Sequence, residues 1–361
     1  MLNMKLYLIG GFLGSGKTTA IINASRQLIQ ERKKVAVITN DQGDQQVDSA
    51  LIKSLDIPGK EVINGCFCCN YNQLDSHIQS WTEDFRPDVI FAESVGTCTD
   101  LIATIAKPLG IFRPGLDVVI SVFADASLIS SLLDGTSLFI KESVRYIFKK
   151  QLEEADVLVM NKSDLVSPEQ RARIMEMIGR EYPGKTVLFQ NSLQNDGIRQ
   201  WLERMNSLLQ PARRVSLTLD YDTYGEGEAA LAWLDESISV TSTQGEAVML
   251  ASKIIRSIHK RIQEHHLLIG HLKVFIETEK WQRKISFTST GSDSLSSIEG
   301  QRINWARVLI NARVQTEPEL LRLIVDAAVA RIRQEQGCTI EIEKSSVFKP
   351  GYPKPTHRMA E

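Results

Sequence analysis

The sequence lacks both a strong excess of charge and a long hydrophobic run. The formal net charge is −2 over 361 residues, which does not predict a surface that binds nucleic acid or anionic membranes. No stretch approaches the roughly 20 apolar residues of a membrane span. The N-terminal run MLNMKLYLIGG is too short for a secretion signal and leads directly into a glycine-rich loop. We therefore expect a cytoplasmic protein without nucleic-acid or membrane partners.

Cysteine is also scarce, and its distribution is uneven. Of five cysteines, Cys66, Cys68 and Cys69 fall within the short stretch INGCFCCNYNQ. An odd number with such close spacing does not suit a disulfide framework, and it favours a reducing compartment.

Short β-branched runs alternate with longer amphipathic stretches up to about residue 209. Helices are expected at residues 17–31 and 167–182, the second with Ser167 as N-cap and Pro168 in its first turn. The near-continuous apolar character of the runs is typical of parallel strands covered on both faces. The pattern predicts an α/β doubly wound, mostly parallel sheet, and its strands are KLYLIGG, KVAVITN, DVIFAES, LDVVISVFAD, ADVLVMNK and KTVLF.

The pattern of apolar and polar residues changes after residue 209. We expect a P-loop domain at 1–209, a linker at 210–218 that contains QPARR, and an α+β ferredoxin-like domain at 219–345. The end, 346–361, is rich in proline and is expected to be an extended or mobile tail. Within the second domain, strands are expected at 233–243, 272–277, 284–290, 307–315 and 338–343, and helices at 246–266 and 318–333.

The stretch GGFLGSGKTT fits the pattern G-x-x-x-x-G-K-[ST] between a predicted strand and a predicted helix. Glycines let the backbone wrap so that its N–H groups face phosphate oxygens. Lys17 is the candidate catalytic lysine on the β- and γ-phosphates, and the Thr18 hydroxyl is the candidate Mg²⁺ ligand. The candidate nucleotide-binding residues of this loop are Gly11, Gly14, Ser15, Gly16, Lys17, Thr18 and Thr19.

A second signature predicts which base is bound. VLVMNKSDL places Asn161, Lys162 and Asp164 at the end of an apolar strand. A carboxylate at the last position can accept hydrogens from N1 and the 2-amino group of guanine, which adenine does not offer. The signature therefore favours GTP over ATP, with Ser192 in the next loop as a further backbone contact.

Acidic residues lie where loops would meet the phosphates. Glu93 ends a predicted strand and can hold Mg²⁺ or orient the attacking water; the alternative is a helix cap. Asp41 and Asp44 lie in the expected first switch loop, and Asp41 is a candidate for polarising water.

The three clustered thiols have several interpretations. They precede a predicted helix with Asn70 as its N-cap, and a helix N-terminus favours thiolate over thiol. Cys66, Cys68 and Cys69 could bind Zn²⁺, Co²⁺ or Cu(I), form a redox pair, or be inert core residues. Three thiolates would leave one coordination position open, whereas a structural zinc site normally takes four protein ligands.

Together these segments resemble the CobW-type P-loop GTPases, which are regarded as metallochaperones or metal-insertion proteins related to those of urease and hydrogenase maturation. The resemblance rests on GGFLGSGKTT, INGCFCCN, AESVG and NKSD in this order, and it covers about the first 210 residues. It implies that GTP binding and hydrolysis to GDP are coupled to a transition metal, zinc or cobalt, held by the three cysteines. It also implies a client metalloenzyme or corrinoid protein, and a homodimer stays open.

Two departures from the family pattern stand out. The switch segment reads Asn40-Asp41-Gln42-Gly43, where the family usually has N-E-x-G. The second domain also lacks the aromatic and proline pattern expected of the usual CobW C-terminal domain.

Alternatives to a metallochaperone are a nucleotide-dependent regulatory or scaffold protein with a static structural zinc, and a small-molecule kinase. NKSD argues against the kinase.

A group of histidines could form a second metal-binding site or cap a helix end; it comprises His259, His265, His266 and His271. Cys98 could approach the metal or pack as a small residue, and Cys338 is expected in the core.

Overall fold

The chain forms two compact units. The computed structural model describes residues 4–43, 47–135, 141–208, 214–292, 295, 298, 300–334 and 337–360. The first unit comprises Met1–Gln42, Leu55–Gly227 and Pro353–Glu361, and the second comprises Gly43–Ser54 and Glu228–Tyr352. Both units therefore contain segments that are distant in the sequence.

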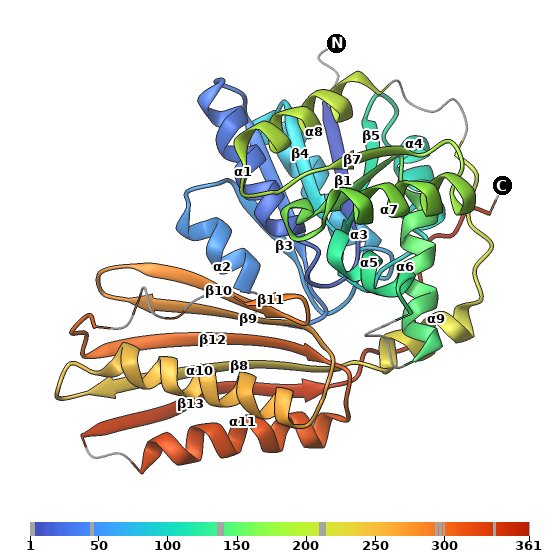
Figure 1. Ribbon diagram of the computed structural model, residues 1–361. Coiled ribbons are helices and arrows are strands. Elements are labelled where there is room, and N and C mark those ends of the chain that lie inside the picture. The colour runs from blue at the N-terminus through green and yellow to red at the C-terminus, as the bar shows by residue number, and fades with distance from the viewer. Residues whose placement is uncertain are drawn as a thin grey trace. The chain divides into compact units, whose positions relative to one another are not determined.

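The first unit is built on a seven-stranded parallel sheet with the order β3-β2-β4-β1-β5-β6-β7 (Figure 1). Its strands are β1 (Lys5–Gly10), β2 (Val35–Asn40), β3 (Gly59–Val62), β4 (Val89–Glu93), β5 (Asp117–Asp125), β6 (Val157–Asn161) and β7 (Thr186–Phe189). The chain moves outward from β1 in both directions. Since crossovers are right-handed, the connecting helices cover opposite faces, and ligands are expected at the carboxyl ends of the strands. The doubly wound P-loop fold is confirmed.

Helices flank this sheet. They are α1 (Lys17–Gln30), α3 (Tyr71–Ser80), α4 (Lys107–Phe112), α5 (Ala126–Leu133), α6 (Glu142–Glu154), α7 (Pro168–Glu181), α8 (Asn195–Ser207) and α9 (Tyr221–Ala229). The N-cap predicted at Ser167 is confirmed, and it belongs to a capping box, since its side chain and that of Gln170 bond reciprocally to backbone N–H groups. Among the described residues no helix is both long and apolar enough to cross a membrane.

The second unit has a six-stranded antiparallel sheet with the order β11-β10-β9-β12-β8-β13. Its elements are β8 (Ala232–Ser242), α10 (Ala247–Glu264), β9 (Ile269–Thr278), β10 (Gln282–Thr288), β11 (Gly291–Ser292), β12 (Trp305–Val314), α11 (Pro318–Arg333) and β13 (Cys338–Phe348). Without the added β10–β11 hairpin the order is β-α-β-β-α-β, so the ferredoxin-like α+β fold is confirmed. Apolar residues of α10 and α11 pack against the sheet and form its core.

Helix α2 (Val47–Ser54) follows β2 in the sequence but packs in the second unit. Asp48 at its first turn pairs with Lys273 at 2.5 Å and with Lys284 at 2.7 Å. These two cations lower the pKa of Asp48 despite its burial, and the Val47 N–H donates to Asn311 Oδ1 at 2.8 Å. Helix α2 is therefore held by a buried charge at Asp48 and by the hydrogen bond of the Val47 N–H.

Three details differ from the sequence-based expectation. Strand β3 lies at an edge of the sheet and is short and polar, so its sequence GKEV carries little strand signal. The helix after the thiols ends at Ser80 and continues as a π-helical turn, Trp81–Phe85. Asn70 occupies the N-cap position, but its side chain donates to Ile63 O at 2.9 Å and does not cap the helix.

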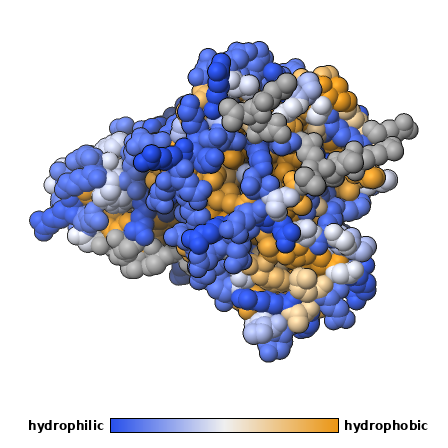
Figure 2. Space-filling model, turned by 90° about the horizontal axis from the view of Figure 1, so that it is seen from above, coloured by the Kyte–Doolittle hydropathy of each residue, from blue (hydrophilic) through white to orange (hydrophobic). Residues whose placement is uncertain are grey.

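Hydrophilic residues cover most of the face seen in Figure 2, and hydrophobic residues are visible between them.

The proline-rich end of the chain was expected to be extended or mobile. Residues 353–360 are extended, and they belong to the first unit, where hydrogen bonds hold them.

Candidate nucleotide and metal site

The loop after β1 requires glycine at two positions. Gly11 has φ of 124°, and a Cβ there would lie 2.1 Å from the carbonyl oxygen of Phe123. Gly16 has φ of 92°, and its Cβ would lie 2.3 Å from Nδ2 of Asn161. Only glycine fits both the left-handed conformation and these close approaches. The loop is thereby shaped to point backbone N–H groups at an anion.

Lys17 and Thr18 begin α1 directly behind this loop, and both are buried. Lys17 Nζ donates to Gly11 O at 2.7 Å, so the ammonium group lies across the loop that would hold the phosphates. Thr18 Oγ1 donates to Glu93 Oε1 at 2.9 Å. A hydroxyl and a carboxylate in contact at a phosphate loop are the hard oxygen donors that Mg²⁺ prefers. These residues therefore fit a magnesium ion.

The NKSD segment lies at the end of β6. Asn161 Nδ2 donates to Ser15 O at 2.7 Å, and its Oδ1 accepts from the Ser192 N–H at 2.9 Å. Asn161 therefore joins the phosphate loop to the loop after β7. Lys162 Nζ pairs with Asp125 at 2.7 Å, and Asp164 is exposed. The structure thus brings Asn161, which was expected at the base, into contact with the loop that was expected to hold the phosphates.

The three thiols converge in the turn before α3. Sulfur–sulfur distances are 2.8 Å for Cys66–Cys68, 3.2 Å for Cys66–Cys69 and 3.8 Å for Cys68–Cys69. Three sulfurs at such separations can all lie about 2.3 Å from one ion, which is the Zn–S bond length. Within the described part of the chain, this is the one group of cysteine, histidine or acidic side chains arranged to hold a metal.

The thiols also perturb one another. Hydrogen bonds with Cys68, and then with Cys69 and Cys98, hold the pKa of Cys66 well below its ordinary value. The same contact with Cys66 raises the pKa of Cys69 to about 11 and that of Cys68 as well. The three thiols therefore shift one another's pKa values in opposite directions. The effect of the N-terminus of α3 on these thiols stays a prediction.

Asn40 supports the thiol turn from the end of β2. Its Nδ2 donates to Gly65 O at 2.7 Å, and its Oδ1 accepts from the Phe67 N–H at 2.8 Å. Asn40 directly precedes Asp41 in the expected switch loop. The role of Asn40 was not predicted from the sequence, although Asn40 begins the N-D-Q-G segment that was expected to form the first switch loop.

The C-terminal residues cross the turn that carries the thiols, and this contact was not predicted from the sequence. The Lys354 N–H donates to Cys69 Sγ at 3.3 Å, and the Thr356 N–H donates to Cys68 O at 2.8 Å. The His357 ring lies 4.9 Å from the Tyr71 ring. The tail therefore covers the outer side of the cluster, at the partly exposed thiol.

Other candidates have less support. Asp41 donates its backbone N–H to Val62 O at 3.3 Å, and Asp44 lies outside the described residues. His259 stacks on Phe287 with ring centroids 4.5 Å apart, while His265 and His266 are exposed. Cys338 is partly buried against the core of the second unit.

Residues 5–197 match the family described as CobW/HypB/UreG, nucleotide-binding domain. The chain belongs to this family. The CobW/HypB/UreG match covers the phosphate loop, the thiol turn, Glu93 and the NKSD segment, so the resemblance drawn from these motifs is confirmed.

Curated relatives of this CobW/HypB/UreG protein are named for zinc. The chain is 30% identical over 166 residues to the zinc chaperone YeiR of Escherichia coli, covering 45% of this chain and 47% of that one. It is 30% identical over 185 residues to the zinc chaperone CobW of a Sinorhizobium species, covering 44% and 51%. It is 29% identical over 217 residues to zinc-regulated GTPase metalloprotein activator 1 of Dictyostelium discoideum, covering 50% and 44%. The matches span about half the length of these relatives.

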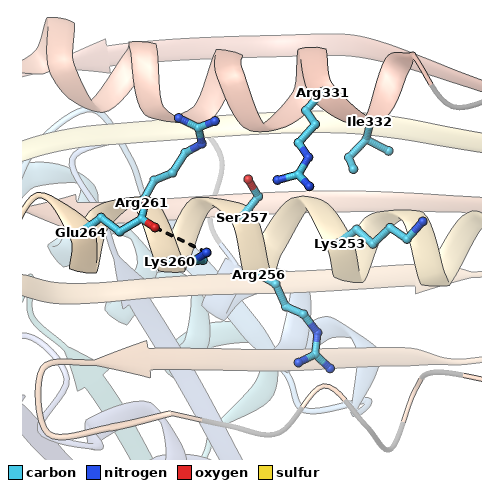
Figure 3. Close-up of a pocket in the computed structure, with 8 residues that line it drawn as sticks. All are labelled: Lys253, Arg256, Ser257, Lys260, Arg261, Glu264, Arg331 and Ile332. Atoms are coloured by element: carbon cyan, nitrogen blue, oxygen red, sulfur yellow. Dashed lines mark ion pairs between the residues drawn. The ribbon is translucent and has the colours of Figure 1, made fainter.

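A basic groove lies on the second unit of the protein, between α10 and α11, with a volume of about 560 Å³. Figure 3 shows Arg261 and Arg331 pointing into the gap between the two helices, and Lys260 paired with Glu264 at 3.5 Å. The groove is lined by Lys253, Arg256, Ser257, Lys260, Arg261, Glu264, Arg331 and Ile332. Its cations outnumber its single carboxylate, so the groove carries a net positive charge.

Proposed function

We propose that this protein binds and hydrolyses GTP and uses the nucleotide state to control a transition metal held by Cys66, Cys68 and Cys69. The observation that supports this proposal most directly is the position of Asn40. It ends β2 beside the expected switch residue Asp41, and it hydrogen-bonds on both sides of Cys66. A movement of the switch segment would therefore act directly on the geometry of the thiols.

In this proposal the nucleotide is held by two groups of residues. The loop from Gly11 to Thr19 takes the phosphates, with Lys17 across the β- and γ-phosphates, and Thr18 and Glu93 hold Mg²⁺. Asn161, Lys162 and Asp164 take the guanine base. Hydrolysis depends mainly on positioning and charge stabilisation, with Glu93 and Asp41 as candidates for orienting water.

The metal itself is the cargo. Thiolates suit Zn²⁺ and Co²⁺, and the zinc-related names of the curated relatives support zinc. The recipient in this proposal is a client metalloenzyme or corrinoid protein, and a homodimer stays open. The site lies in a loop region between the nucleotide motifs, where loss of the γ-phosphate can release it.

The test measures zinc affinity with GDP and with a non-hydrolysable GTP analogue. We expect the two affinities to differ by roughly 5- to 150-fold, the usual range of allosteric coupling. A Cys66→Ser, Cys68→Ser, Cys69→Ser triple variant should lose high-affinity zinc binding but keep nucleotide binding. Equal zinc affinity in both nucleotide states would support a static structural zinc in a regulatory or scaffold protein instead.

A further inference from the structure

A fourth cysteine touches the thiol cluster. Cys98 lies in the loop after β4 and has only 1% of its surface exposed. Its side chain is a hydrogen-bond partner of both Cys66 and Cys68. The three clustered thiols are local in the sequence, whereas Cys98 comes from a separate loop about thirty residues later. Cys98 therefore adjoins Cys66 and Cys68 from a second loop, while among the described residues the sulfurs that all lie within 4.8 Å of one another are those of Cys66, Cys68 and Cys69.

The loop that carries Cys98 is fixed from the side of α6. Gln151 Nε2 donates to Gly96 O at 3.0 Å and to Cys98 O at 2.8 Å. Glu154 Oε2 accepts from the Leu101 N–H at 2.6 Å. The Cys98 N–H closes a turn on Val95 O at 3.0 Å. These bonds hold the Cys98 backbone on both sides and leave its side chain against the cluster.

The same loop begins at the nucleotide site. Glu93, which contacts Thr18, ends β4 only five residues before Cys98. Any shift of Glu93 between nucleotide states is therefore passed along a very short stretch of backbone. The three local cysteines are tied instead to Asn40 on β2. The four sulfurs are thus divided between two strands that both end at the nucleotide.

We propose that Cys98 is the fourth metal ligand and that it completes a four-thiolate zinc site with Cys66, Cys68 and Cys69. Thiolates in a tetrahedral set are a typical donor set for Zn²⁺. Zinc binding releases the protons that the thiols still carry, so metal affinity falls as the pH is lowered. The Lys354 N–H donates to the Cys69 sulfur and offsets part of the negative charge of four thiolates. This inference rests on the proposed metal-binding function and names the ligand that it leaves open.

The composition of the chain permits a direct test. The fifth cysteine, Cys338, lies in the second unit, so a Cys338→Ser variant retains only the four proposed ligands. X-ray absorption of the full chain loaded with one zinc should give four sulfurs at about 2.3 Å in wild type and in Cys338→Ser. Cys98→Ser should give three sulfurs and one oxygen or nitrogen at about 2.0 to 2.1 Å.

Zinc affinity gives a second readout. Cys98→Ser should weaken binding by more than about tenfold, a loss that changes outside the ligand shell already reach. If Cys98→Ser does not fold, the sulfur count of Cys338→Ser still decides the assignment. Three sulfurs in Cys338→Ser, or four in Cys98→Ser, would overturn it. The proposed function is tested by a different result: it would be wrong if zinc affinity were the same with GDP and with the GTP analogue.

Discussion

At the scale of single residues, the proposed preference for guanine rests on Asp164. It is exposed within the 3₁₀ turn Ser163–Leu165, while Asn161 and Lys162 are tied to protein partners. A carboxylate in that position accepts two hydrogens of guanine. An amide presents an N–H group instead, which suits a carbonyl at the 2-position of the base.

We therefore expect Asp164→Asn to weaken GTP binding by about 1.5 to 3 kcal/mol, the range for hydrogen bonds to charged groups. The same change should improve binding of xanthosine triphosphate. Titration calorimetry with both nucleotides measures this exchange. Asp196→Asn, an exposed change on α8, is the matched control and should leave GTP affinity unchanged. Unaltered GTP affinity in Asp164→Asn would refute the assignment of the base site.

Glu154 gives a prediction about pH. Burial raises the pKa of Glu154 well above its ordinary value, and the nearby Asp100 adds to this effect. The folded state thus holds the proton more tightly than the unfolded state does. The contribution of the protonated Glu154 side chain to stability is complete below the ordinary glutamic acid pKa of about 4.3. It is lost as the pH rises through the raised pKa of Glu154 in the folded state.

We expect the urea midpoint of the wild type to fall as the pH is raised through this range. Glu154→Gln should flatten that part of the curve because the side chain no longer titrates. Glu153→Gln, its exposed neighbour, should keep the wild-type slope. An identical slope in Glu154→Gln and wild type would contradict the buried, protonated carboxyl group.

At the scale of elements, the end of β2 and the thiol turn act together through Asn40. Asn40→Ala removes the partner of the Phe67 N–H and of Gly65 O. Leaving such groups unpaired costs about 1 to 3 kcal/mol. We expect zinc affinity to fall by roughly tenfold, as for other losses around a metal site, and its dependence on nucleotide to shrink.

Nucleotide affinity measured without zinc is the control for Asn40→Ala and should change little, because Asn40 makes no bond to the phosphate loop. Loss of nucleotide binding in this variant would mean that Asn40 belongs to the nucleotide site itself. Retained nucleotide-dependent zinc binding would mean that the coupling takes another route.

Elements with a strong period or a motif were predictable from the sequence, and contacts between distant segments were not. Strand β1, helix α1 and the glycine loop follow from apolar pattern and motif, as does the N-cap at Ser167. Strand β3 was missed because an edge strand needs few apolar residues. The Cys98 contact depends on how two loops fold toward each other, which local pattern does not encode.

At the scale of the whole molecule, two chain segments cross between the compact units. Helix α2 packs in the second unit, and residues 353–360 belong to the first. The returning tail is fixed by Arg358, whose Nε lies 2.7 Å from Asp100, and by Met359, whose N–H donates to Ala103 O at 2.9 Å. These contacts could not be predicted from the sequence because the tail has no periodic pattern.

Removal of residues 353–361 should expose Cys69 to solvent. We expect its alkylation by iodoacetamide to become several-fold faster in the metal-free protein, because thiol reactivity depends on access as well as on pKa. Mass spectrometry of the modified peptides measures this rate, with Cys338 in the same chain as the internal reference. An unchanged rate at Cys69 would contradict the covering role of the tail.

The central claim is that the nucleotide site and the thiol site are coupled, and coupling is reciprocal. The most direct measurement is the affinity of the GTP analogue, relative to that of GDP, for zinc-free and zinc-loaded protein. We predict that zinc changes this ratio by the same factor, roughly 5- to 150-fold, by which the nucleotide changes zinc affinity. A ratio that zinc leaves unchanged would contradict the account.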